Sequence, residues 1–187
     1  MSEVFSTGHK VFTFTDRDNF SKKYSGYLDN FYRTVWDIDY IEIVSDRDRQ
    51  IRGVDKILHL KDGNKLHIDE KIESIKQTDN IVFEDKTDID ADKDGWLTEG
   101  QLTDYVVFYQ VNMNKIYVIP FNLMLKMHLE NRDIWMKSGR ERIIMNKTPY
   151  GYYRGRIYLV PKPELYDYMS TVGNIPYEKI EYSYTFS

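Results

Sequence analysis

Two short runs joined by a tight-turn sequence constrain the fold of this chain more than any other feature. Residues 54–60 and 66–72 both have the apolar and β-branched content typical of strands, and Lys61-Asp62-Gly63-Asn64-Lys65 between them contains an Asp-Gly turn pair. Side chains two residues apart on a strand point the same way, so Asp69 and Lys71 share one face and the apolar residues share the other. The pattern predicts a β-hairpin with its apolar face on a core and its polar face open to a cleft.

The polar face of this predicted hairpin carries two acids and a lysine. Gly53-Val54-Asp55 opens the first strand, and the hairpin brings Asp55 within reach of Asp69 on the second. Two neighbouring carboxylates repel each other, and a bound divalent cation is the usual relief. Mg²⁺ suits such a pair because it takes one or two carboxylates plus substrate phosphate oxygens, and Mn²⁺ can replace it. Lys71 can then hold an attacking water or neutralise developing charge, so these residues predict metal-dependent phosphodiester cleavage.

The same residues resemble the PD-(D/E)xK phosphodiesterase superfamily, in which a metal-binding Asp lies on one strand and an acid-x-Lys triplet on the next. Asp55 matches the first acid, and Asp69 and Lys71 match the triplet. The resemblance implies that the backbone carbonyl of Glu70 completes a metal site formed by Asp55 and Asp69. No Pro precedes Asp55, and many members of the superfamily lack it too.

The resemblance covers about residues 37–120 and extends to small nuclease-like proteins of bacteria and their phages or other mobile elements. It implies a hydrolase that cuts DNA, with a restriction-endonuclease-like core. Many such enzymes act as dimers, so a homodimer stays open for this chain. The wider pattern consists of Gln50, Gly53-Val54-Asp55, Ile68-Asp69-Glu70-Lys71, Phe83-Glu84, Gly95-Trp96-Leu97 and Thr103-Asp104-Tyr105.

Two further polar residues are weaker candidates for the catalytic group. Glu84 closes a strand predicted over 80–83, where it is either another metal ligand or an ordinary acid at a strand end. Gln50 either hydrogen-bonds a catalytic water or phosphate, or is a polar residue before a strand. The whole hairpin also has a simpler interpretation, in which Asp69 and Lys71 form a solvated surface pair worth little. In that case the chain is a noncatalytic nucleic-acid or protein interaction module on a nuclease-like scaffold.

A second motif, residues 90–101, matches the first half of a calcium-binding EF-hand loop. Acids stand at its positions 1, 3 and 5, and Gly95 stands at position 6. Gln101 occupies position 12, where the loop needs a bidentate Glu, and the flanking runs favour strands where an EF-hand needs helices. We therefore expect an acidic loop between strands, turned at Gly95, rather than a Ca²⁺ site. A calcium-binding protein is the third alternative.

Charge is distributed unevenly along the chain. The formal net charge is -4, which argues against a broad nonspecific nucleic-acid binder. Residues 79–104 contain nine acids and two lysines, whereas residues 137–162 contain seven basic residues and one acid. The basic stretch also holds four tyrosines, a mixture able to contact phosphates and stack on bases. It predicts a DNA face, or else a solvated strand pair, built from Arg140, Arg142, Lys147, Arg154 and Arg156.

The order of predicted elements indicates an α+β (mixed α/β) fold with a central mixed β-sheet flanked by helices. A helix is expected over 16–36, and strands are expected over 40–44, 54–60, 66–72, 80–83, 104–110, 115–120 and 156–160. Further helices are expected over 122–135 and around 165–169, and the tail from 177 is either a docked strand or loose. The length suits one domain over residues 1–187. The chain lacks cysteine, an apolar leader and a long apolar run, so we expect a cytoplasmic protein without a membrane span.

Overall fold

A computed structural model of the chain describes residues 14–73, 79–148 and 151–184. Its centre is a mixed six-stranded sheet, here called sheet A, with strand order β1-β2-β3-β6-β7-β10. β3 and β6 run parallel, and the other neighbouring strands of sheet A are antiparallel. The strands are β1 (Ile38–Ile43), β2 (Lys56–Leu60), β3 (Lys65–Glu73), β6 (Tyr105–Gln110), β7 (Lys115–Pro120) and β10 (Glu181–Ser183).

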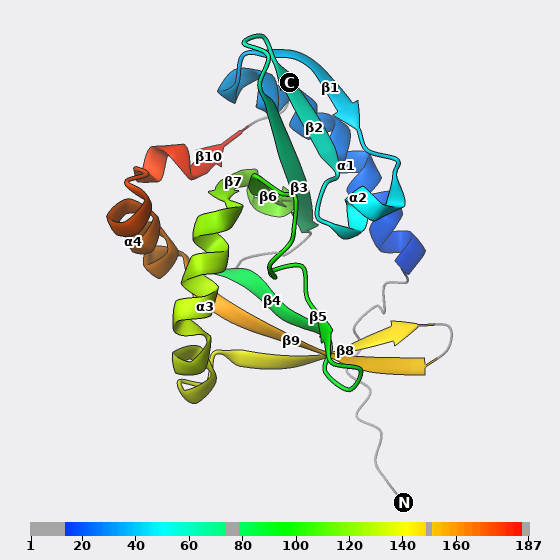
Figure 1. Cartoon of the computed structure of the whole chain (residues 1–187), viewed down its shortest axis with the longest axis vertical. Helices are drawn as coiled ribbons and strands as arrows, with labels where there is room; N and C mark the ends of the chain where they lie inside the picture. The colour runs from blue at the N-terminus through cyan, green and yellow to red at the C-terminus, as the bar shows by residue number, and fades with distance from the viewer. Residues whose placement is uncertain (1–13, 74–78, 149–150, 185–187) are drawn as a thin grey trace, which may run out of the picture.

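One face of sheet A is covered by helix α1 (Phe14–Val35) (Figure 1). Apolar residues recur every three to four positions in α1, which places Leu28, Phe31 and Tyr32 on one side of the helix. These three side chains are fully buried against inward-facing residues of the sheet, which include Leu58, Ile68, Val107, Tyr109, Ile116 and Val118. The first hydrophobic core therefore lies between α1 and sheet A.

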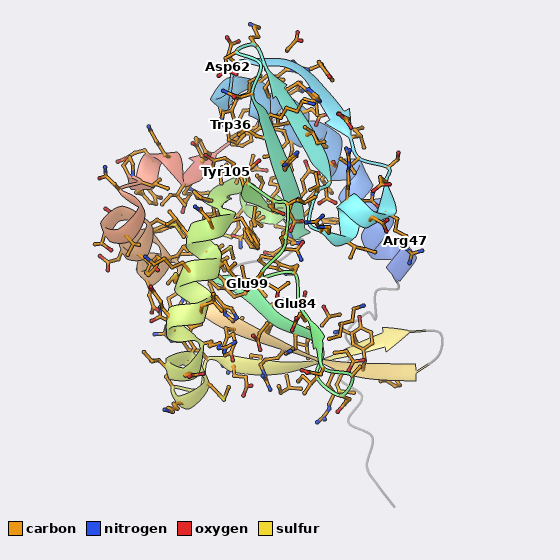
Figure 2. All side chains as sticks on the ribbon, in the orientation of Figure 1. Trp36, Arg47, Asp62, Glu84, Glu99 and Tyr105 are labelled. Atoms are coloured by element: carbon orange, nitrogen blue, oxygen red, sulfur yellow. The ribbon has the colours of Figure 1, made fainter. Side chains whose placement is uncertain are left out.

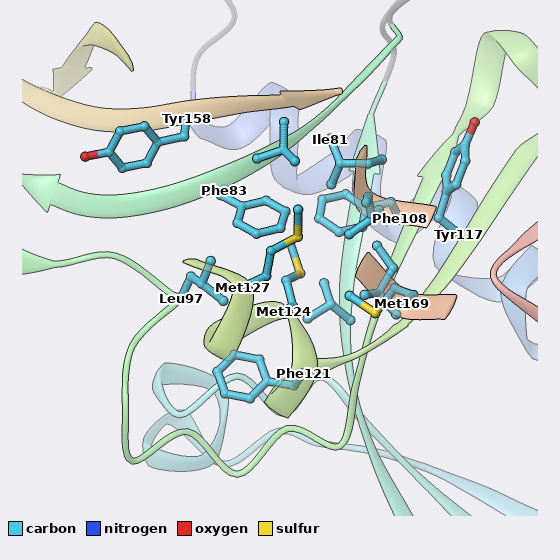
Figure 3. Packing of buried hydrophobic residues seen from close by; sticks show 14 of the residues in the cluster. Ile81, Phe83, Leu97, Phe108, Tyr117, Phe121, Met124, Met127, Tyr158 and Met169 are labelled. Carbon is cyan, nitrogen blue, oxygen red and sulfur yellow. The ribbon is translucent and has the colours of Figure 1, made fainter. Parts of the chain in front are cut away.

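The other face of sheet A packs on two helices and a second sheet. Sheet B is antiparallel with strand order β5-β4-β9-β8, and it lies below sheet A in Figure 1. Figure 3 shows the second core, in which Met124 and Met127 lie close to Phe83 and Phe108. The elements are β4 (Asn80–Asp88), β5 (Lys93–Asp94), α3 (Phe121–Lys137), β8 (Glu141–Thr148), β9 (Gly151–Pro161) and α4 (Lys162–Gly173).

The connection between the parallel strands β3 and β6 is unusual. Parallel neighbours need a long crossover, which is most often a helix. Here the described part of the crossover, from residue 79 onward, contains β4, β5 and an irregular segment, and β4 pairs with β9 in sheet B. The superfamily core expected from the sequence runs helix, strands, helix, strand, but the next long helix, α3, follows β7. The predicted strands over 104–110 and 115–120 join the central sheet as β6 and β7.

The predicted mixed α+β class, with a central mixed sheet flanked by helices, is confirmed. Three elements were not expected: the five-residue helix α2 (Arg47–Ile51), the short strand β5 and the edge strand β8. The helix predicted around 165–169 is longer, as α4. The described part of the tail, to residue 184, pairs with β7 as β10 after a 3-10 turn at Tyr177–Lys179, and the last three residues of the predicted tail lie outside the described residues. Within the described residues, no helix is both long enough and apolar enough to cross a membrane.

Candidate functional site

A pocket of about 390 Å³ lies at the open end of the β2–β3 hairpin. The turn that closes the hairpin is at the opposite end of the strands, where Figure 2 labels Asp62. Gly63 has φ +89°, and the N–H of Asn64 bonds to Asp62, as the Asp-Gly turn signal predicted. Residues from β2, β3, α2 and the acidic loop line the pocket, among them Gln50, Asp55, Asp69, Glu70, Lys71 and Trp96.

The two predicted carboxylates, Asp55 and Asp69, lie in this pocket. Asp69 is only 3% exposed. The Oδ2 atom of Asp55 accepts a hydrogen bond of 2.8 Å from the backbone N–H of Glu70, so the second strand fixes the first acid in place. Burial, followed by the Asp69 charge, raises the pKa of Asp55 to about 7. The two acids therefore share a site that resists carrying both negative charges.

Lys71 completes the group predicted from the sequence. Its Nζ donates to Oδ1 of Asp69 at 2.7 Å, and it lies 4.9 Å from the ring centroid of Trp96. Burial lowers the pKa of the Lys71 ammonium, but the surrounding carboxylates, first Asp69 and then Asp55 and Glu84, more than offset this, and the net pKa is raised. The lysine therefore stays charged, with its ammonium fixed between a carboxylate and an aromatic face.

The side chain of Glu70 points away from Asp69 and Lys71, toward α1. It accepts hydrogen bonds from the Ser25 hydroxyl at 2.5 Å and from the Tyr32 hydroxyl at 2.8 Å, and it lies 3.1 Å from the ammonium of Lys56. Burial raises the pKa of Glu70, and these partners partly offset the rise. The alternation of the strand accounts for the direction of this side chain, although no local pattern identified its partners.

Gln50 lines the same pocket from α2, whereas Glu84 does not. The side-chain amide of Gln50 donates to the carbonyl of Val44 at 2.9 Å, and this bond fixes the side chain at the wall of the pocket. Glu84 is on β4 near β5 (Figure 2), and its carboxylate accepts a 3.4 Å hydrogen bond from the N–H of Trp96. Its charge contributes to the raised pKa of Lys71, so it acts on the site through electrostatics.

The backbone that leads into Asp55 is held by the segment after the acidic loop. Gly53 has φ +74°, and a side chain there would collide with the hydroxyl of Thr103. That hydroxyl donates to the carbonyl of Gly53 at 2.5 Å, and the N–H of Leu102 donates to the carbonyl of Arg52 at 2.9 Å. Glycine is therefore required at the first position of the Gly53-Val54-Asp55 motif.

The basic stretch predicted to bind DNA is largely paired with acids. Arg140 pairs with Glu164 at 2.5 Å, Arg154 pairs with Asp90, and Arg156 pairs with Asp85 at 3.2 Å and with Glu141 at 2.8 Å. Arg142 donates to the backbone carbonyls of Gly139 and Glu141. The side chain of Lys147 lies outside the described part of the chain. Pairing of β4 with β9 thus brings the acidic and basic stretches together, so they partly cancel.

The EF-hand-like residues form an acidic loop between β4 and β6, and this loop contains the short strand β5. Asp92 and Asp94 both pair with Lys86, at 2.8 and 2.6 Å, and Asp90 pairs with Arg154. The prediction that Gly95 makes the turn is wrong: Asp92 has φ 50°, while Gly95 allows β5 to approach the backbone of Glu84 closely. The strands predicted on the two sides of the loop, over 80–83 and 104–110, are confirmed as β4 and β6.

The pocket offers few protein ligands for a cation. In residues 14–73, 79–148 and 151–184, no three His, Cys, Asp or Glu side chains gather as a metal cluster. The fit to Mg²⁺ rests instead on the buried Asp69 and the half-buried Asp55, because Mg²⁺ commonly takes one or two carboxylates and keeps waters or phosphate oxygens in its remaining positions. The raised pKa of Asp55 means that its ionised form is disfavoured in this pocket, and a bound cation would favour that form.

Comparisons with protein-family models, with curated proteins and with solved structures found no match to this chain. The interpretation of the pocket therefore depends on the residues that line it.

Proposed function

We propose that the protein is a metal-dependent nuclease that hydrolyses DNA phosphodiester bonds at the β2–β3 pocket, as its resemblance to the PD-(D/E)xK superfamily implies. One observation carries the proposal: Asp55, Asp69 and Lys71 line a single pocket, and the lysine is bonded to the second acid. This arrangement is more specific than the sequence triplet alone, because a buried carboxylate, a half-buried carboxylate and a charged lysine line the same pocket.

Each residue has a role that its environment supports. Asp55 and Asp69 would hold Mg²⁺, with Mn²⁺ as a substitute, and the Glu70 carbonyl would be a third ligand. When bound, the ion would supply Lewis-acid polarisation of the scissile phosphate and a lowered pKa for a coordinated water. Lys71 would use an N–H that Asp69 does not occupy to orient the attacking water or to contact a phosphate oxygen. Gln50 would contact the water or the phosphate from the α2 side of the pocket.

Glu84 has a subordinate place in this proposal. It lies on the neighbouring sheet and influences Lys71 by its charge, so we assign it to the electrostatic surroundings of the lysine rather than to the metal ligands. Trp96 covers the lysine with its ring and lines the pocket, where it would also limit the access of water.

The test is cleavage of supercoiled, linear, single-stranded and branched DNA in Mg²⁺, Mn²⁺, Ca²⁺ or EDTA. The wild type is compared with Lys71→Met and with Lys61→Met, a matched control because Lys61 forms an exposed Lys–Asp pair with Asp37 at 2.6 Å. We expect the wild type and the control to cut with Mg²⁺ or Mn²⁺, and Lys71→Met to be slower by roughly 10²–10³-fold. Absence of wild-type cleavage with every metal and substrate would contradict the proposal.

A further inference from the structure

We propose that Lys56 and Glu70, which helix α1 fixes at one side of the pocket, are positioning residues that hold Asp55, Asp69 and Lys71 in place. The expected effect on cleavage rests on the proposed function, whereas the expected effect on the backbone of β3 does not.

The two side chains form the centre of a buried polar network. Lys56 has 3% of its side chain exposed, and its ammonium donates to the Ser25 carbonyl at 2.8 Å and to the Asp29 carboxylate, and contacts Glu70 at 3.1 Å. Glu70 has 6% of its side chain exposed, and its two oxygens accept from the hydroxyls of Ser25 and Tyr32. Three partners for the ammonium and three for the carboxylate leave little freedom for either group to move.

The network approaches the pocket from the side of α1, and Ser25, Lys56 and Glu70 line that side of it. Lys56 directly follows Asp55, and Glu70 stands between Asp69 and Lys71, so the side chains of the network alternate along the strands with those of the two acids and Lys71. The N–H of Glu70 donates to Asp55 at 2.8 Å. Glu70 is therefore anchored by its side chain on one face and anchors the first acid by its backbone.

Stability alone is a weak explanation for these charges. They border the apolar cluster of Leu28, Phe31 and Tyr32, where an apolar pair of similar volume often stabilises a protein as well as a buried ion pair does. Hydrogen bonds hold charged side chains in one orientation, whereas apolar contacts do not. A displacement of the order of 1 Å in a reacting group can cost about 10²-fold in rate. Residues that fix β3 at the side of the pocket would thus matter most for turnover.

The test combines amide hydrogen exchange, measured by NMR, with cleavage kinetics in Mg²⁺. The variants are Lys56→Met, Glu70→Gln and the mild Tyr32→Phe, which removes one hydroxyl and keeps the ring. Lys115→Met is the matched control, because Lys115 forms a 2.6 Å pair with Glu181 on the far side of sheet A. Exchange at the Glu70 amide is compared with exchange at Val160, a fully buried residue of β9, to correct for global unfolding.

We expect each network variant to speed exchange at Glu70 by about tenfold or more relative to Val160, and to lower kcat by a similar factor with little change in KM. Lys115→Met should change neither ratio. Equal acceleration at Glu70 and Val160, or unchanged exchange at Glu70 in folded variants, would overturn the inference. If the wild type cuts no DNA, the proposed function fails, and the exchange ratio alone still decides the positioning role.

Discussion

Replacing the Asp55 carboxyl by an amide should stabilise the metal-free protein above neutral pH. Burial, followed by the Asp69 charge, raises the pKa of this carboxyl from 3.8 to about 7. The folded state therefore holds the proton more tightly than the unfolded state, and the free energy of unfolding falls as pH rises from about 4 to about 7. A shift of this size costs about 4 kcal/mol at pH 8 and about 2 kcal/mol at pH 5. Asp55→Asn avoids this cost and keeps an oxygen to accept the Glu70 N–H.

The assay is urea unfolding in EDTA at pH 5 and pH 8, followed by circular dichroism. Asp133→Asn is the control, because the Asp133 side chain is 80% exposed. We expect Asp55→Asn to gain about 2 to 3 kcal/mol more at pH 8 than at pH 5, and the control to gain nothing. Added Mg²⁺ at pH 8 should stabilise the wild type more than the variant. An equal effect of Asp55→Asn at both pH values, or a variant less stable than the wild type at pH 8, would refute the electrostatic reasoning.

Two other perturbations follow from the surroundings of the pocket. Gly53→Ala should lower the free energy of unfolding by about 1–3 kcal/mol, because φ is +74° and the added methyl group collides with Thr103. An unchanged midpoint of thermal unfolding would show that the motif tolerates a side chain. Arg142→Ala should weaken DNA binding and flatten the slope of log K against log[salt] by about 1, because Arg142 donates to carbonyl oxygens and its charge is free to meet phosphate. Arg156→Ala should leave that slope unchanged, since Asp85 and Glu141 cancel its charge; a flatter slope in this variant would place Arg156 on the DNA face.

Local sequence patterns predicted the pocket-forming hairpin well. The Asp-Gly turn and strand alternation depend on neighbouring residues, so they placed Asp69 and Lys71 on one face and Asp55 within reach of them. Helix α1 was predicted for the same reason, because its buried residues recur at helical spacing. These features need no knowledge of distant parts of the chain.

Contacts between distant segments could not be predicted. The side chain of Glu70 falls on the otherwise apolar face of β3, and its partners Ser25 and Tyr32 lie 45 and 38 residues away in the sequence. Helix α2 has five residues, too few to show a helical period, and its start depends on a cap in which Asp46 accepts from the N–H of Arg49. The acidic and basic stretches appeared as separate surfaces because only the pairing of β4 with β9 joins them.

The most direct test of the proposed site is the initial rate of DNA cleavage in Mg²⁺ by the wild type, Asp69→Asn and Asp94→Asn. Asp69 is buried in the pocket, whereas Asp94 belongs to the exposed acidic loop, so the comparison also separates the two candidate cation sites. We predict that Asp94→Asn cuts like the wild type and that Asp69→Asn, folded by circular dichroism, is slower by at least about 100-fold. A folded Asp69→Asn protein that cuts at the wild-type rate would contradict the assignment of this pocket as the nuclease site.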